Sequence, residues 1–97
     1  MRVEYHPALE KELLEIVEYY NQCTQGFGFE FLNEFERQIL TIAAMPMQWR
    51  VVDADIRRVL MKRFPYVIYF RILDNDVVRV TVVKHQHRHP AHELGRK

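Results

Sequence analysis

The sequence is poor in the residues on which several common enzyme sites depend. Its 97 residues include no serine, three glycines and one cysteine, Cys23. The absence of serine excludes a Ser-His-Asp hydrolase, and three dispersed glycines leave no glycine-rich loop that could bind a phosphate. Cys23 has no partner for an intrachain disulfide and no acid–base partner near it in the sequence, so we expect an idle thiol rather than a nucleophile.

Long apolar runs and a secretory leader pattern are also missing. The longest apolar-leaning stretch falls short of a membrane span, and the first residues show no signal-peptide pattern. Together with the single cysteine, these absences predict a cytoplasmic protein. A length of 97 residues, with 48% hydrophobic and 28% charged residues, suits one globular unit, so we assign residues 1–97 to a single domain.

Charge is divided unevenly along the chain. Residues 1–49 carry three Lys or Arg side chains against eight Asp or Glu, a net charge of −5. Residues 50–97 carry eleven against five, a net charge of +6, so the whole chain is only +1. The basic half predicts attraction to phosphates or to an acidic protein. A second interpretation stays open, in which acidic helices beside basic strands are simply solvated.

Two helices are predicted in the acidic half. Pro7 suits the first turn of a helix, and the apolar residues after it recur with the helical period over about residues 8–22. A second apolar stripe runs over residues 27–44 and ends at Met45-Pro46, because a residue before proline disfavours the helical conformation. This stripe consists of Phe27, Phe31, Leu32, Phe35, Ile39, Leu40 and Ile42. We interpret it as core, and the short connection predicts an antiparallel helix pair.

Strands are predicted at the start of the chain and in its basic half, where the hydrophobic period changes to two. The predicted strands are residues 2–5, 56–63, 65–72 and 77–84. Residues 47–55 are expected to form a loop, 74–76 a polar turn and 85–97 a polar tail. Short connections make the last three strands an antiparallel meander. The order β-α-α-β-β-β predicts an α+β fold, an antiparallel twisted sheet with an antiparallel helix pair packed on one face.

The tail contains four of the five histidines, His85, His87, His89 and His92. The first three alternate and could share one face of an extended segment, but no cysteine or acidic motif accompanies them, so we expect neither a metal ion nor a cofactor. An imidazole beside a bound substrate could act as acid or base, which makes His85 and His87 candidate catalytic residues. The remaining interpretation is a solvated tail with a few hydrogen-bonded side chains.

Basic residues are interleaved with apolar ones along the predicted strands. They occur at positions of both parities, so charge should reach both faces, and the face that the helices leave open would become a basic surface. The candidate binding residues are Arg57, Arg58, Lys62, Arg63, Arg71 and Lys84. Such a surface suits RNA or an acidic peptide. The same charges also suit the protection of sheet edges.

Short segments spread over nearly the whole chain carry a family resemblance. The most specific are Arg63-Phe64-Pro65-Tyr66 and the tail pattern His85-x-x-Arg88-x-Pro90. They are accompanied by Pro7-Ala8, Glu12-Leu13, Tyr19-Tyr20, Gly28, Phe31, Glu36, Ile39, Ile42, Pro46, Arg57-Arg58 and Arg96. Together these segments resemble the RelE/ParE toxin superfamily, and most closely its members labelled plasmid stabilisation proteins.

The resemblance implies a toxin of a type II toxin–antitoxin system. Such a toxin inhibits bacterial growth and is neutralised by a cognate antitoxin protein, with which it can form a hetero-oligomer. The overall similarity implies the ParE-like branch, whose target is DNA gyrase and which has no catalytic set. One alternative is the RelE-like branch, which cuts messenger RNA on the ribosome without a metal ion. A second alternative is a non-toxic binding module of the same fold.

The RelE-like alternative would need an acid, a base and cations for the phosphate. The candidate catalytic residues for this chemistry are His85, His87 and Arg88, and Lys62 or Arg63 could also hold the phosphate. Three positions depart from the family patterns. They are Val67, where the nucleases have a central arginine, His92, near their late tyrosine, and Glu93, where the family often has tryptophan.

Overall fold

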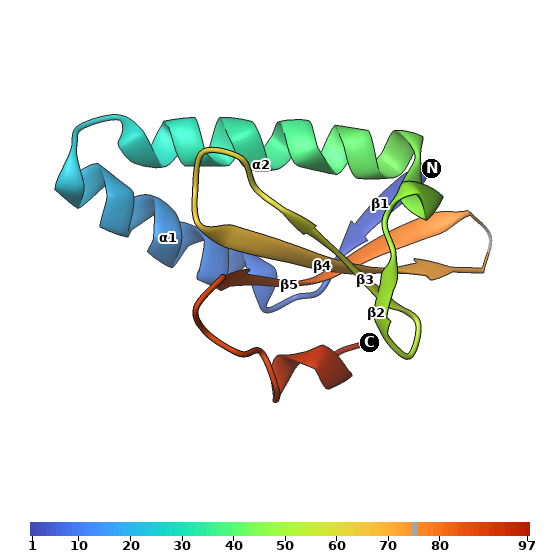
Figure 1. Ribbon diagram of the computed structural model, residues 1–97. Helices are drawn as coiled ribbons and strands as arrows, with labels where there is room; N and C mark the ends of the chain where they lie inside the picture. Colours follow the sequence, from blue (N-terminus) through green and yellow to red (C-terminus); the bar gives the residue numbers. More distant parts are fainter. Residues whose placement is uncertain (75) are drawn as a thin grey trace.

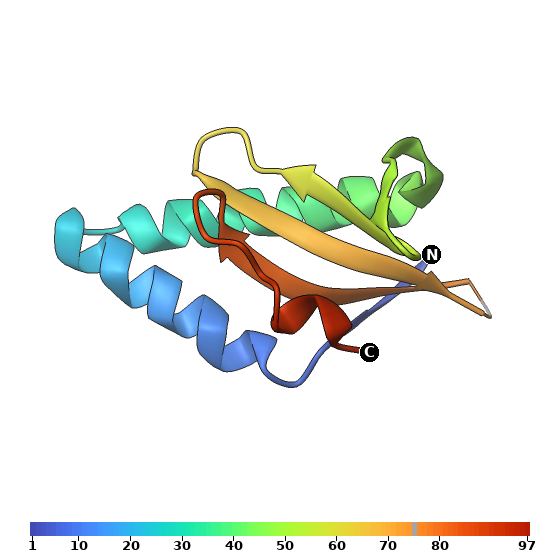
Figure 2. The same cartoon turned by 60° about the horizontal axis from the view of Figure 1, so that its bottom comes forward.

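The chain folds into a sheet that two helices cover on one face and the C-terminal tail crosses on the other (Figure 1, Figure 2). The computed structural model describes residues 1–74 and 76–97, so Asn75 of the predicted turn lies outside the described residues. The elements are β1 (Arg2–Tyr5), α1 (Leu9–Cys23), α2 (Phe27–Ala44), β2 (Val51–Asp53), β3 (Ile56–Leu60), β4 (Tyr66–Leu73) and β5 (Val77–His85), with 3-10 turns at Pro46–Gln48 and Glu93–Gly95. The predicted α+β class is confirmed.

The two helices approach each other so closely that the first turn of α2 requires a glycine. A Cβ at Gly28 would clash with the carbonyl oxygen of Val17 on α1. The Gly28 N–H instead donates to Oδ1 of Asn21 at 2.8 Å. Gly26, between the helices, has φ +83°, which other residues rarely adopt. The predicted antiparallel helix pair is therefore confirmed (Figure 1). No helix among the described residues is both long and apolar enough to cross a membrane.

The sheet is mixed, which corrects the prediction of a wholly antiparallel sheet. Its strand order is β1-β5-β4-β3-β2, in which β3, β4 and β5 form the predicted antiparallel meander and β1 lies parallel to β5. Alternation in residues 2–5 identifies a strand but contains no information about its neighbour or direction. The additional strand β2 lies within the predicted loop 47–55, where its three exposed residues show no alternation.

The strand predicted for residues 56–63 ends at Leu60. Beyond it, Met61 and Phe64 turn their side chains into the core, where they are 6% and 3% exposed. The amides of Lys62 and Arg63 donate to the carboxylate of Glu34 on α2. These amides are satisfied by the helix rather than by a sheet ladder, and the strand stops here.

Two apolar clusters lie on opposite faces of the sheet. The larger lies between the sheet and the helices and includes the predicted core residues Phe31, Phe35, Ile39 and Ile42. The smaller, on the other face, consists of Ile56, Val67, Tyr69 and Val82, with Leu94 of the tail packed against it. The tail therefore forms a thin third layer, and the face expected to be open is partly covered.

Candidate functional site

The six predicted binding residues do not gather on one face of the sheet. Arg57 points to the helix side, where its guanidinium donates to the carbonyl oxygen of Trp49 at 2.5 Å. Arg71 and Lys84 lie on the opposite face beneath the tail. The remaining three, Arg58, Lys62 and Arg63, line a groove beside α2, which Arg58 borders from the edge region of the sheet, since it alternates with Arg57 and shares the face of its partner Tyr69. The single basic surface expected from the sequence is thus divided among three places.

The groove beside α2 is the first of two candidate sites, and we call it the α2–β3 groove. It has a volume of about 760 Å³ and lies between α2, the segment around β2, and β3 with the loop after it. Its cationic lining residues are Arg37, Arg50, Arg58, Lys62 and Arg63. Its exposed apolar lining includes Val52 and Leu60, which are 44% and 53% exposed.

Glu34 fixes the rim of the α2–β3 groove. This glutamate is only 3% exposed, and its two carboxylate oxygens accept hydrogen bonds from the N–H groups of Lys62 and Arg63 at 2.6 and 2.9 Å. The guanidinium of Arg63 also contacts Glu30, one helical turn earlier, at 2.8 Å. Sequence reasoning missed Glu34, although a carboxylate on the apolar stripe between Phe31 and Phe35 signals a buried acceptor with a specific partner.

Most cations of this groove are free to meet a partner. Within residues 1–74 and 76–97, the side chains of Arg37, Arg50, Arg58 and Lys62 make no hydrogen bond or ion pair with the chain itself. The buried carboxylate of Glu34 already serves two backbone amides. Five cations therefore surround an apolar strip with a single lining carboxylate, which is a suitable receiver for an acidic segment.

The second candidate site, which we call the α1–tail groove, lies between α1 and the end of β5. It has a volume of about 870 Å³. The candidate catalytic residues His85, His87 and Arg88 all line it, so the structure brings these three together. The facing residues, which sequence reasoning did not connect with them, are Glu12, Glu15, Ile16, Tyr19, Tyr20 and Tyr66.

Aromatic rings run across the α1–tail groove. The centroids of Tyr19 and Tyr20 lie 5.3 Å apart, those of Tyr66 and His85 5.4 Å, and those of His85 and His87 also 5.4 Å. Tyr20 and Tyr66 join the two groups at 6.3 Å. The Nδ1 atom of His85 accepts the His87 N–H at 3.2 Å, which fixes the first turn of the tail.

The hydroxyls of Tyr20 and Tyr66 in this groove stay neutral near neutral pH. Burial, helped by the neighbouring Tyr66, Tyr19 and Cys23, raises the pKa of Tyr20 to about 12. Burial also raises the pKa of Tyr66, while the Arg88 guanidinium acts in the opposite direction. Both phenols can therefore donate a hydrogen bond to a ligand.

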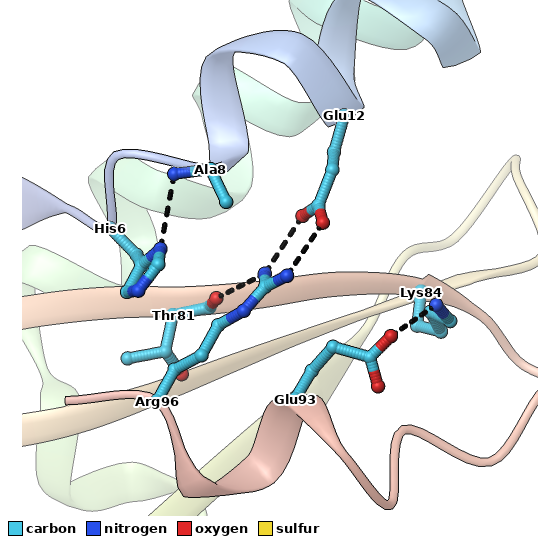
Figure 3. Close-up of polar contacts among 7 residues, drawn as sticks. All are labelled: His6, Ala8, Glu12, Thr81, Lys84, Glu93 and Arg96. Carbon is cyan, nitrogen blue, oxygen red and sulfur yellow. Dashed lines mark hydrogen bonds and ion pairs between the residues drawn. The ribbon is translucent and has the colours of Figure 1, made fainter.

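The cations that the tail covers, Arg71 and Lys84, already have partners in the chain. Arg71 contacts Asp55 at 2.6 Å and the Leu94 carbonyl oxygen at 3.3 Å. The Lys84 ammonium contacts Glu93 at 2.6 Å, and this hydrogen bond is the main cause that lowers the pKa of Glu93 (Figure 3). Two of the predicted binding residues thus hold the tail in place.

Arg96 locks the tail to α1. Its guanidinium forms two hydrogen bonds with the Glu12 carboxylate, at 2.8 and 2.9 Å, and a third with the carbonyl oxygen of Thr81 at 3.2 Å (Figure 3). The register between β4 and β5 shifts here, since Tyr69 pairs with Val82 and Phe70 with Val80. Thr81 is therefore an extra residue, a β-bulge, whose carbonyl oxygen is free for Arg96.

Two other positions considered in the sequence analysis, Val67 and His92, line neither of the two grooves. Val67, where the nucleases have a central arginine, is a buried apolar residue on the tail-side face, and His92 is exposed at the last 3-10 turn. Among the residues that the structure describes, no group of three or more His, Cys, Asp or Glu side chains could hold a metal ion.

Comparisons with known proteins agree with this architecture. A family model described as "ParE toxin of type II toxin-antitoxin system, parDE" matches residues 3–90. A solved structure titled "Chromosomal ParDE TA system from P. aeruginosa" is similar to this chain with a TM-score of 0.76 and 13% sequence identity, over 88% of this chain and 95% of that one. At this identity, the structural likeness shows the fold alone. No curated protein matches the sequence.

Proposed function

Because the chain belongs to the ParE toxin family of type II toxin–antitoxin systems, we propose that an acidic segment of its antitoxin occupies the α2–β3 groove and keeps the toxin inactive. An antitoxin is the partner that membership of this family implies. The proposal concerns where and how that partner binds. The observation that carries it is the cluster of four cations in the groove without partners in the described chain, Arg37, Arg50, Arg58 and Lys62.

Charge gives the groove its selectivity for an acidic segment. The positive charges of the groove would attract the negative charges of an acidic peptide over a screening length of about 8–10 Å at physiological ionic strength. A partly disordered acidic segment that orders on binding suits this kind of surface. Affinity would come mainly from the apolar strip, in which Val52 and Leu60 expose close to half of their area.

The outer edge of β3 supplies a third contact. β2 pairs with β3 only through Val51 opposite Arg57 and Asp53 opposite Ile56. Among the residues that the structure describes, no strand therefore pairs with the outer side of β3 beyond Arg57. We propose that the antitoxin segment is extended here and adds a strand, so that backbone hydrogen bonds give affinity while acidic side chains reach Arg58 and Lys62.

The proposed target of the free toxin is DNA gyrase in the bacterial cytoplasm, and inhibition of gyrase would stop growth. Membership of the ParE family supports this target over the ribosome. The RelE-like alternative is favoured by one observation, which is that His85, His87 and Arg88 line a single groove. It lacks the central arginine at Val67, whose place in this fold is buried and apolar. We therefore propose gyrase inhibition rather than RNA cleavage.

Expression of the chain alone in a bacterial host tests the toxin role. We expect growth arrest that is rescued by co-expression of the antitoxin from a neighbouring reading frame. Purified toxin should cause gyrase-dependent DNA cleavage and leave messenger RNA intact. Messenger cleavage at the ribosomal A site, lost in His85→Ala or Arg88→Ala, would instead support the nuclease. Normal growth with a folded protein would support the non-toxic binding module.

A charge reversal tests the location of the antitoxin. Arg58→Glu should weaken antitoxin binding and rescue, because an acidic side chain then faces the acidic segment. Lys11→Glu is the matched control, since Lys11 is an exposed cation on α1 outside the groove. Binding of the purified antitoxin, measured by calorimetry, should fall for Arg58→Glu alone. Equal binding by both variants would contradict the proposed location.

A further inference from the structure

The α1–tail groove has a chemical character that antitoxin binding at the α2–β3 groove does not explain. The two grooves have no lining residue in common. We propose that the α1–tail groove binds a nucleotide unit, with an aromatic base stacked against the rings of Tyr19 and His87 and a phosphate held by Arg88. The proposal is one of binding, without cleavage, and does not rest on the antitoxin site.

Two rings of this groove, those of Tyr19 and His87, are exposed where core rings are not. Tyr19 is 59% exposed, whereas Phe31, which belongs to the same aromatic cluster through Tyr20, is fully buried. His87 is also exposed, and its ring lies 5.4 Å from that of His85. Exposed rings on both walls of a groove leave ring faces without a partner. Nucleobases stack on such faces whatever their sequence.

Arg88 supplies the positive charge that a phosphate requires. It is exposed and makes no side-chain hydrogen bond or ion pair within the part of the chain that the structure describes. It lines the α1–tail groove together with Tyr66. Arginine can bind two phosphate oxygens at once, and the neutral hydroxyls of Tyr20 and Tyr66 can donate further hydrogen bonds.

The carboxylates of Glu12 and Glu15 line the same groove, and their negative charges affect how well it can bind a phosphate. The negative charge of Glu12 is compensated by the Arg96 guanidinium, which donates two hydrogen bonds to its carboxylate. Glu15 has no such partner among the described residues, so it opposes a bound phosphate. The structure therefore predicts modest affinity, and it predicts that removal of the Glu15 charge strengthens binding.

An acidic peptide suits this groove less well than a nucleotide. β1 pairs with β5 only as far as Val80, so no strand among the described residues covers that side of β5 at this groove, but Glu15 of α1 lines the same groove and would repel an acidic peptide. The apolar lining is small, consisting of Ile16, Pro65 and Val83 besides the rings. Ring faces and one free guanidinium match a base and its phosphate more closely than they match a peptide backbone.

Fluorescence anisotropy of a short labelled oligouridylate with the purified full chain tests the proposal. Tyr19→Ala and Arg88→Ala should each weaken binding about tenfold, because each removes either a stacking face or the phosphate ligand. Arg50→Ala is the matched control, an exposed cation of the α2–β3 groove, and should change the affinity by less than about twofold. Glu15→Gln should bind more tightly than the wild type. Circular dichroism would verify that each variant is folded.

Competition experiments identify the class of ligand that the α1–tail groove binds. Uridine monophosphate or unlabelled oligouridylate should displace the probe, and inorganic polyphosphate of equal charge should do so poorly. Competition by the mononucleotide would indicate a free nucleotide as the ligand, and competition by the strand alone would indicate single-stranded nucleic acid. Equal displacement by polyphosphate, or equal losses in Arg50→Ala and Arg88→Ala, would overturn the proposal. The proposal would also be overturned if the folded wild-type chain failed to bind the oligonucleotide and Tyr19→Ala weakened antitoxin binding instead.

Discussion

The cations beside α2 and those beneath the C-terminal tail come from the same basic half of the sequence, yet their surroundings differ. Arg71, Arg79 and Lys84 each contact an acceptor of the tail, namely the carbonyl oxygens of Leu94 and Lys97 and the carboxylate of Glu93. Arg58 and Lys62 have side chains with no acceptor in the described chain. Two of the three tail acceptors are backbone carbonyls, which a count of charges cannot reveal.

This difference separates two roles for a basic residue. On the tail side, the positive charges stabilise the fold and are unavailable to a partner. On the α2 side, a single buried glutamate positions the loop, and the cations around it stay free. Perturbing one set should change stability, whereas perturbing the other should change recognition. The variants below test that division, beginning with the one expected to have the largest effect.

Replacement of Glu34 by alanine should destabilise the chain the most. The substitution leaves the amides of Lys62 and Arg63 without their buried acceptor, at a cost of about 3 kcal/mol. Urea denaturation monitored by Trp49 fluorescence would measure the change. Glu36→Ala, an exposed glutamate of the same helix, is the control and should stay within about 0.5 kcal/mol. Similar stability for both variants would show that Glu34 does not hold the loop.

Replacement of Arg96 by alanine should have an intermediate effect, confined to the tail. The variant loses two hydrogen bonds to Glu12 and one to Thr81, and we expect a loss of about 1–2 kcal/mol. Hydrogen exchange would show faster exchange of tail amides, with the helix pair unchanged. Exchange that accelerates equally throughout the chain would contradict a local role for Arg96.

The Lys84–Glu93 contact should give a smaller effect that depends on pH. The hydrogen bond from Lys84 lowers the pKa of Glu93 below its ordinary value of 4.5. The contact therefore stabilises the fold above that value, and the stabilisation is lost as the pH falls through the lowered pKa of the folded state. Because both side chains are partly exposed, we expect less than about 1 kcal/mol.

A comparison of wild type with Glu93→Gln measures this contribution. The difference in unfolding free energy between the two proteins should be present near pH 7 and should shrink as the pH is lowered below 4.5. A difference that stays constant over this range would show that ionisation of Glu93 does not matter to the tail.

The sequence predicted those parts of the fold that depend on local periodicity. The Phe31, Phe35, Ile39 and Ile42 stripe is core, and the last three strands form the expected meander. The family resemblance is also confirmed. Leu40, predicted to widen the stripe, is 71% exposed instead. The buried face of α2 includes Glu34 and Gln38 and leaves Leu40 outside it, so the polar residues lie where a count of apolar positions alone would not place the core.

Features that depend on contacts distant in the sequence could not be predicted in the same way. The parallel pairing of β1 with β5 joins the two ends of the chain, and nothing in residues 2–5 specifies that neighbour. The sequence of the tail is mostly polar, and its packing depends on one apolar residue, Leu94, and on backbone oxygens that accept hydrogen bonds from arginines of the sheet. The residues His85, His87 and Arg88 are close in sequence, so their proximity was expected, but the tyrosines of α1 that face them were not.

The association rate of the antitoxin, measured by stopped-flow at increasing salt, tests the division between the two sets of cations most directly. Lys62→Gln and Lys84→Gln each remove one positive charge, the first from the α2–β3 groove and the second from beneath the tail. We predict that association of the wild type slows as salt rises, that Lys62→Gln associates more slowly at low salt with a weaker salt dependence, and that Lys84→Gln behaves as the wild type. Association that is independent of salt, or that is slowed equally by both substitutions, would contradict the account.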